Sequence, residues 1–387
     1  MTALAAWAIL GTATPARAQR TFASSDLPSG QSIAKVVCLD DAIQSYALYL
    51  PSGYAPNRAW PVIYAFDPAG RGLNPIDRYQ AAAEKYGYIV AWSNNSRNGP
   101  WTVIEAAVSA MTKDVASRFR IDPRRTYAAG MSGGSRAALA LGLSVPDMAG
   151  VMASSAGYAD GKRRKELPFA VFETAGTEDF NYSEMREIDR DLTTPHLLAV
   201  FEGGHIWLSP ELAMDAVEWM ELQAMKSGRK PRDQAEADAI YATRVARVAT
   251  DQVDQDSWLA TKAIAEDFAG LKDVSQFTAK ATVMGKDKRV RDAIRTDLKR
   301  DDEERQTRQA IQVAVASLAN SNQHADALKQ LSQRAKTLSE TAAGPTDTPE
   351  RRMARRVLSE MLMNGSTTKD AEYGAILKQY RMARPGR

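Results

Sequence analysis

Short apolar runs alternate with longer helix-periodic stretches between residues 61 and 226. Residues 61–66 (Pro-Val-Ile-Tyr-Ala-Phe) form an uninterrupted apolar run, which is typical of a strand buried on both faces. Residues 101–119 carry apolar side chains at helical spacing and predict a long amphipathic helix. The same reasoning predicts strands at 32–39, 44–50, 88–93, 126–130, 150–154, 169–174 and 196–201, and helices at 78–86, 133–144, 183–192 and 209–226. Such alternation predicts an α/β unit with a mainly parallel sheet covered by helices on both faces.

The pattern changes at residues 227–232 (Ser-Gly-Arg-Lys-Pro-Arg), beyond which no convincing strand is predicted. Helix-periodic runs follow at 234–248, 254–271, 287–319, 321–341, 349–363 and 367–382. Gly or Pro residues separate them, most clearly at 344–349 and 364–366. We therefore expect an α/β domain over 32–226 and a charged all-α domain over 234–387, built of stacked helical hairpins without a fixed repeat period.

Composition narrows the class of protein. A chain of 387 residues with 44% hydrophobic and 25% charged residues is typical of a globular protein of two domains. The formal net charge of +3 is too small to indicate nucleic-acid binding, and no basic cluster is interleaved with aromatic residues. The single cysteine, Cys38, excludes an intramolecular disulfide and a cysteine-based zinc site.

The N-terminus predicts export. Residues 1–18 combine a short apolar run with Ala16-x-Ala18, a plausible signal-peptidase site, although a basic segment before the run is missing. The run is too short to span a membrane, so no integral membrane segment is expected after processing. We expect a secreted or periplasmic protein; a simple N-terminal tail is the alternative.

A nucleophile-elbow motif lies between a predicted strand and a predicted helix. Gly130-Met131-Ser132-Gly133-Gly134 matches the G-x-S-x-G pattern, in which a tight turn forces the serine into a strained backbone conformation. The hydroxyl of Ser132 would stand at a helix N-terminus, where a developing negative charge is favoured. Because three specified residues of common types within five positions also occur by chance, the motif needs partners elsewhere in the chain.

The partners follow in the order that α/β-hydrolases use, Ser then Asp or Glu then His. Asp179 lies in the loop after predicted strand 169–174, with Glu178 as the alternative acid. His205 follows predicted strand 196–201 in a Gly-flanked loop, whereas His196 starts that strand and His324 lies in the helical region. Structural alternatives stay open: Asp179 could cap a helix or shape a turn, and His205 could be a surface loop residue.

These residues predict acyl transfer by a catalytic triad. His205 would take the proton of Ser132, and Asp179 would orient the imidazole. The N–H of Gly133 would be one donor of the oxyanion hole, and the loop after strand 61–66 should supply the second. Pro68 has no N–H, so Ala69 is the predicted second donor, with Gly70 as the alternative.

Further residues are expected on the same side of the domain. The polar loop 93–100 should shape the site, although neither Arg97 nor Asn98 receives a role. Four aromatic residues could line a pocket for an acyl or aryl group, or could simply pack loops onto the sheet: Trp101, Phe180, Tyr182 and Trp207. We see no metal-binding cluster and no phosphate-binding glycine loop, and expect neither a metal nor a cofactor.

Together the motifs resemble those of α/β-hydrolase-fold serine esterases. The resemblance covers residues 32–226 and rests on Ile121-Asp122-Pro123-x-Arg125-x-Tyr127-x-x-Gly130-x-Ser132-x-Gly134, Gly176-x-x-Asp179 and Gly203-Gly204-His205-x-Trp207. Within these esterases, the chain most resembles the secreted polyhydroxybutyrate-depolymerase and feruloyl-esterase-like branch and the dienelactone-hydrolase-like esterases. Such esterases usually carry His-Gly after the third strand, where this chain has Asp67-Pro68.

The resemblance implies hydrolysis of a small-molecule or polymer ester. Two alternatives remain at this point: a serine peptidase of the same fold, and a non-catalytic protein that binds a protein partner through its helical domain.

Overall fold

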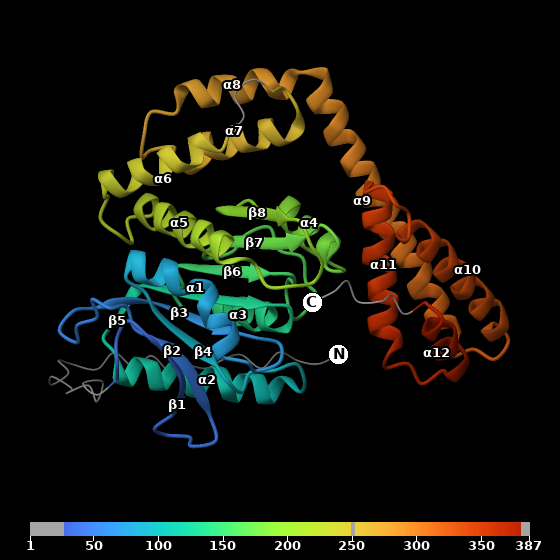
Figure 1. Cartoon of the computed structure of the whole chain (residues 1–387), viewed down its shortest axis with the longest axis horizontal. Helices are drawn as coiled ribbons and strands as arrows, with labels where there is room; N and C mark the ends of the chain where they lie inside the picture. The colour runs from blue at the N-terminus through green and yellow to red at the C-terminus, as the bar shows by residue number, and fades with distance from the viewer. Residues whose placement is uncertain (1–26, 249–251, 381–387) are drawn as a thin grey trace.

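One eight-stranded sheet forms the centre of the protein (Figure 1). The computed structural model describes residues 27–248 and 252–380. The strands lie in the order β1-β2-β4-β3-β5-β6-β7-β8, with β1 and β2 antiparallel to their neighbours and the others parallel. Their bounds are β1 Ser32–Val37, β2 Ser45–Tyr49, β3 Trp60–Phe66, β4 Ile89–Ser93, β5 Ile121–Met131, β6 Gly150–Ser154, β7 Ala170–Gly176 and β8 His196–Phe201. This is the sheet of the α/β-hydrolase fold, so the predicted fold class is confirmed.

Helices cover both faces of the sheet. α2 (Trp101–Arg118), α3 (Gly133–Ser144) and α4 (Tyr182–Asp191) pack on one face, and α1 (Leu73–Tyr86) and α5 (Pro210–Lys226) pack on the other. Strand β3 shows why its sequence is apolar throughout. Val62, Tyr64 and Phe66 point into the core beneath α2, α3 and α4, whereas Ile63 and Ala65 point into the core beneath α1 and α5. Alternate residues of a strand face opposite sides, and here both sides are buried.

Beyond α5 the described chain is helical, without a further named strand. The helices are α6 Gln234–Ala246, α7 Gln255–Asp267, α8 Ser275–Lys286, α9 Lys288–Ser317, α10 His324–Ala342, α11 Pro349–Gly365 and α12 Ala371–Lys378. The outer side of α5 is covered by α6 and α7, with Leu222 and Met225 of α5 in one core with Ile240 and Phe268. The long α9 then leads to α10–α12, which have their own apolar core and lie beyond the carboxyl ends of the strands (Figure 1).

Helix α8 was not predicted. Its apolar face is short: Phe277, Ala281 and Met284 stand at helical spacing, but Met284 is its buried residue and Val283 is 71% exposed. Gly285 and the β-branched Thr and Val residues also lower its helix propensity. The helix is instead stabilised by tertiary contact with α7. Gly285 lies so close to α7 that a Cβ on it would be 3.1 Å from Nε1 of Trp258.

Residues 1–18, the predicted signal peptide, lie outside the described residues. In the part of the chain that the structure describes, no helix combines the length and apolar character needed to cross a membrane.

Candidate active site

Ser132 occupies the sharp turn between β5 and α3. Its backbone is at φ 56° and ψ −123°, a conformation that non-glycine residues rarely adopt and that marks functional turns. The turn leaves no room for side chains on either flank. A Cβ at Gly130 would lie 2.1 Å from the carbonyl oxygen of Gly134, and one at Gly134 would lie 2.0 Å from that of Phe66. The strained elbow expected from the motif is therefore present.

Asp179 and His205 are joined by a hydrogen bond. Oδ1 of Asp179 lies 2.8 Å from Nδ1 of His205, and the Asp179 side chain is 0% exposed. Asp179 follows β7 and His205 follows β8; parallel neighbours bring these loops to the same sheet edge as Ser132. A proton on Nδ1 directed to the carboxylate leaves Nε2 as the acceptor. The alternative acid, Glu178, instead forms an ion pair with Arg355 at 2.7 Å.

The loops that carry Asp179 and His205 approach each other closely. A Cβ at Gly176 would lie 2.4 Å from the carbonyl oxygens of Gly203 and Gly204, so a side chain at this position would push the two loops apart. The ring of Phe180 lies against the His205 imidazole, with centroids 4.0 Å apart. These contacts, together with the bond to Asp179, restrict the orientation of the imidazole.

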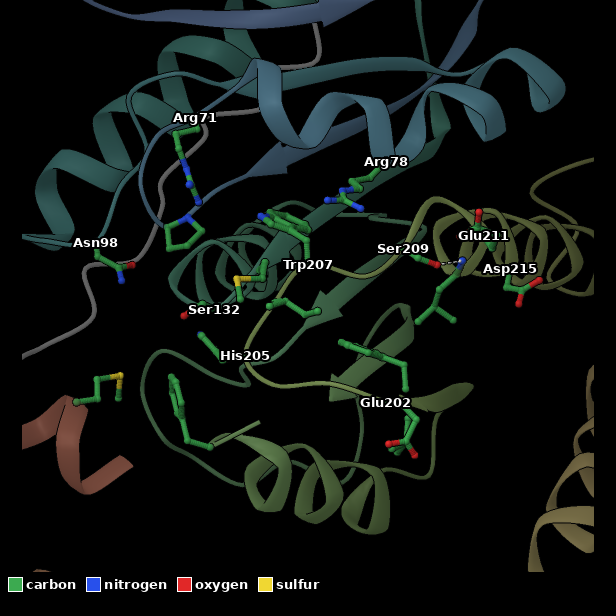
Figure 2. A pocket seen from close by; sticks show the side chains of 18 residues that line it. Arg71, Arg78, Asn98, Ser132, Glu202, His205, Trp207, Ser209, Glu211 and Asp215 are labelled. Carbon is green, nitrogen blue, oxygen red and sulfur yellow. Dashed lines mark hydrogen bonds between the residues drawn. The ribbon is translucent and has the colours of Figure 1, made fainter. Parts of the chain in front are cut away.

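Ser132 and His205 face the same cavity, which has a volume of about 1070 Å³ (Figure 2). Its wall also contains Phe180, Trp207 and Met363, the last from α11. The cavity thus brings together the elbow, the histidine loop and the helical region. Among the described residues, no group of three or more His, Cys, Asp or Glu side chains is arranged to hold a metal ion.

The four predicted aromatic residues have different positions. Phe180 and Trp207 line the cavity, whereas Trp101 and Tyr182 do not belong to its wall. Trp101 is half-buried against the core on its face of the sheet, and the ring of Tyr182 lies 4.4 Å from the guanidinium of Arg356. Trp101 and Tyr182 begin α2 and α4, and their positions agree with the packing alternative. Substrate contact by Phe180 and Trp207 stays a prediction.

Asp67 organises the loop after β3. Its buried carboxylate accepts hydrogen bonds from the N–H of Ala69 (2.8 Å), from Nε of Arg71 (3.2 Å) and from Nε1 of Trp207 (2.9 Å). The N–H of Gly70 donates to the carbonyl of Asp67 at 3.1 Å. The prediction of Ala69 as second oxyanion donor therefore needs correction. Its N–H already has a carboxylate partner, and Ala69 is absent from the cavity wall.

Two parts of the site carried no decisive sequence signal. Asn98 lines the cavity beside Ser132, and a Cβ at Gly133 would lie 1.7 Å from Oδ1 of Asn98. Helix α11 contacts both loops of the site. Nη1 of Arg356 donates to the carbonyl oxygen of Thr177 at 2.6 Å, and Arg352 pairs with Glu202 at 3.1 Å. The polarity of loop 93–100 pointed toward Asn98, but no local pattern indicated that α11 would dock here.

Similar proteins were found among solved structures. No family model matches the chain, and no curated protein matches its sequence. Among solved structures, a mutant feruloyl esterase module from Clostridium thermocellum complexed with sinapinate is 16% identical, covers 49% of this chain and 86% of its own, and has a TM-score of 0.39. An esterase from the Planctomycetes species Thermogutta terrifontis is 15% identical over 51% of this chain and 93% of its own, with a TM-score of 0.38. A puromycin hydrolase is 16% identical over 51% of this chain but only 39% of its own, also at 0.38.

The structural neighbours thus include feruloyl esterases and other esterases of the α/β-hydrolase fold, at low identity over about half of the chain. The assignment of the fold itself rests on the order and direction of the strands.

Proposed function

We propose that the protein is a serine hydrolase that cleaves carboxylic esters through an acyl-enzyme intermediate on Ser132. The observation that carries the proposal is the hydrogen bond between Asp179 and His205 at a cavity that also contains the strained Ser132. A strained serine, an imidazole and a buried carboxylate together are the parts that nucleophilic acyl transfer needs.

The chemistry follows from these positions. Nε2 of His205 removes the proton from Oγ of Ser132 as this oxygen attacks the carbonyl carbon of the ester. The tetrahedral intermediate collapses, the C–O bond to the alcohol breaks, and the imidazolium protonates the departing alcohol. Water, deprotonated by the same imidazole, then attacks the carbonyl carbon of the acyl-enzyme. The bond between this carbon and Oγ of Ser132 breaks, the imidazolium returns its proton to Oγ, and the acid is released. The carboxylate of Asp179 stabilises the imidazolium in both halves.

The N–H of Gly133 supports the negative charge that develops on the carbonyl oxygen. Gly133 is the first residue of α3, so its N–H has no partner within the helix and lies at the positive end of the helix dipole. Preorganised N–H groups of this kind lower the barrier because they need no reorientation during the reaction.

The cavity wall supports an acyl or aryl group as the bound part of the substrate. Phe180, Trp207 and Ile206 provide apolar surface beside Ser132 and His205. We expect the ester of a small molecule or of a polymer, with its acyl or aryl part against this apolar surface.

Labelling by a fluorophosphonate probe tests the proposal directly. We expect wild-type protein to be labelled and the Ser132→Ala variant to remain unlabelled at the same folded concentration. Turnover of p-nitrophenyl esters with little turnover of aminoacyl-amides would support the esterase. Absence of labelling between neutral and alkaline pH would refute the hydrolase, and amide cleavage alone would favour a peptidase instead.

A further inference from the structure

The expected backbone partner of Gly133 in the oxyanion hole is missing. In related folds the second N–H comes from the loop after the third strand of the sheet. Here Pro68 has no N–H, the N–H of Ala69 donates to the Asp67 carboxylate, and the N–H of Gly70 donates to the Asp67 carbonyl. The N–H groups of Ala69 and Gly70 are thus engaged within their own turn, so among the described residues neither of them is free to be the second donor.

We propose that the side-chain amide of Asn98 is the second donor of the oxyanion hole. This inference rests on the proposed hydrolase function. Asn98 belongs to the loop between β4 and α2, far in sequence from Ser132, and its side chain lines the same cavity (Figure 2).

The position of Asn98 relative to Gly133 supports this assignment. A Cβ built on Gly133 would lie 1.7 Å from Oδ1, 2.8 Å from Cγ and 3.4 Å from Nδ2 of Asn98. The amide therefore lies directly against the residue whose backbone N–H is the first donor. A carbonyl oxygen held at the Gly133 N–H, beside Ser132, would therefore lie close to the Asn98 amide.

The backbone holds Asn98 there. Its N–H donates to the carbonyl oxygen of Pro68 at 2.8 Å, and the preceding residue, Arg97, forms a β-bridge with Ala69. The N–H groups of the loop after β3 thus bond within the loop, whereas the carbonyl of Pro68 accepts from Asn98. This bond holds Asn98 in the position from which its side chain can act as a donor in place of the loop.

The side-chain amide is free to present its NH₂ group. Among the described residues, neither Oδ1 nor Nδ2 of Asn98 has a hydrogen-bond partner that would fix its orientation. Oδ1 is the amide atom nearest Gly133, and a half-turn about the Cβ–Cγ bond exchanges it with Nδ2 at nearly unchanged shape. An oxyanion attracts Nδ2 and repels Oδ1, so the intermediate itself selects the donor orientation.

The inference can be tested with two substitutions of Asn98. Asn98→Ala removes the amide, and Asn98→Asp keeps its shape but replaces the donor by a negative oxygen. Loss of a side-chain oxyanion donor lowers kcat by about 10²–10³. We expect a loss of this size for Asn98→Ala, with KM changed only a few-fold, and a loss at least as large for Asn98→Asp.

The matched control is Arg97→Ala, which removes an exposed neighbouring side chain in the same loop and should keep wild-type kcat. A second readout separates a donor from a packing residue. The affinity for a boronic acid that mimics the tetrahedral state should fall in parallel with kcat, whereas the affinity for the uncharged alcohol product should not.

The outcomes distinguish this inference from the proposed function. If wild-type protein is labelled at Ser132 and turns over esters while folded Asn98→Asp retains its kcat, the hydrolase stands and Asn98 is not the donor. If wild-type protein is inert toward probe and esters, both proposals fall. Because Asn98 is exposed and Asp has nearly the same shape, Asn98→Asp should fold normally, which circular dichroism can verify.

Discussion

At the scale of single residues, the site depends on positions where one extra atom cannot be placed. Gly130 and Gly134 are required by backbone contacts of 2.1 Å and 2.0 Å to a hypothetical Cβ, not by flexibility. This packing places Ser132 in a strained backbone conformation with a φ of 56°, which the surrounding strand and helix maintain. The hydroxyl is presented to the cavity as a direct consequence.

Gly134→Ala should therefore destabilise the protein. Its Cβ would meet the carbonyl oxygen of Phe66 in β3, and backbone cannot move as a flexible side chain does. We expect a loss of about 1–3 kcal/mol in the free energy of unfolding, measured by urea denaturation. Gly53→Ala is the control, because nothing lies within 4 Å of its Cβ position. Equal stability of the two variants would contradict this account of the elbow.

Asp179→Asn should retain the fold and lose activity. The amide can occupy the place of the carboxylate beside His205 but favours the wrong tautomer of the imidazole, which lowers kcat by about 10⁴ in triads. Ester turnover measured from pH 6 to 10 would show the loss. The neighbouring Glu178→Gln, which removes a carboxylate that pairs with Arg355, should stay within a few-fold of wild type.

At the scale of elements, the loops at the carboxyl ends of β3 and β8 are tied together through one buried carboxylate. Asp67 after β3 accepts a hydrogen bond from Trp207, which follows His205, and the Trp207 ring packs edge-on against Trp92 of β4. The Asp67-Pro68 sequence that departs from the usual His-Gly thus has a structural role. It fixes the histidine loop, and in doing so it removes the usual backbone donors from the cavity.

Asp67→Ala should weaken both stability and catalysis. The N–H of Ala69 and Nε1 of Trp207 would lose their acceptor, and an unsatisfied buried donor costs about 1–3 kcal/mol. We expect a fall of that order in unfolding free energy, together with reduced kcat because the His205 loop loses an anchor. Asp77→Ala, at an exposed position on α1, should change stability by no more than about 0.5 kcal/mol.

At the scale of the whole molecule, the described part of the helical region is joined to the α/β unit at two main places. One is the outer side of α5, where Trp219 donates to Asp267 at 2.8 Å. The other is a buried cluster at the loops of the site. Glu304 of α9 pairs with Arg356 of α11 and accepts from Ser183 of α4 at 2.6 Å, while Arg356 also reaches the carbonyl of Thr177. The helical region therefore supports the loop of Asp179 and contributes Met363 to the cavity wall.

This cluster should make the docking of α9 and α11 sensitive to acid. Burial opposes ionisation of Glu304, but the hydrogen bond and charge of Arg356 outweigh it and hold the pKa of Glu304 below its usual value. A carboxyl with a lowered folded-state pKa stabilises the protein above the unfolded pKa, about 4.3 for Glu, and this contribution is lost as the pH falls through the lower folded value.

Glu304→Gln tests the acid sensitivity. Removal of one partner of a buried ion pair costs about 3–5 kcal/mol, so the variant should be less stable than wild type at pH 7. The difference between the two proteins, followed by denaturant unfolding, should shrink as the pH falls from 5 toward 2. A difference that stays constant across this range would show that the charge of Glu304 is not what stabilises the docking.

The sequence by itself determined the features that are encoded locally. Runs of apolar residues and their spacing specify strands and helices, so the βα alternation and most helices of the C-terminal region were predictable within a few residues. The order of Ser132, Asp179 and His205 along the chain also follows from motifs next to predicted strands. Since parallel strands end at one edge of the sheet, that order was enough to expect the three residues together.

Only the tertiary structure decided which polar groups meet across long stretches of chain. Whether Ala69 has a free N–H depends on where the Asp67 carboxylate turns, and that in turn depends on Trp207, 140 residues away. The places of Asn98 over Gly133 and of Arg356 against Thr177 are likewise contacts between distant segments. No local period encodes them, because a hydrogen bond depends on the position of both partners in space, which the packed sheet and helices fix.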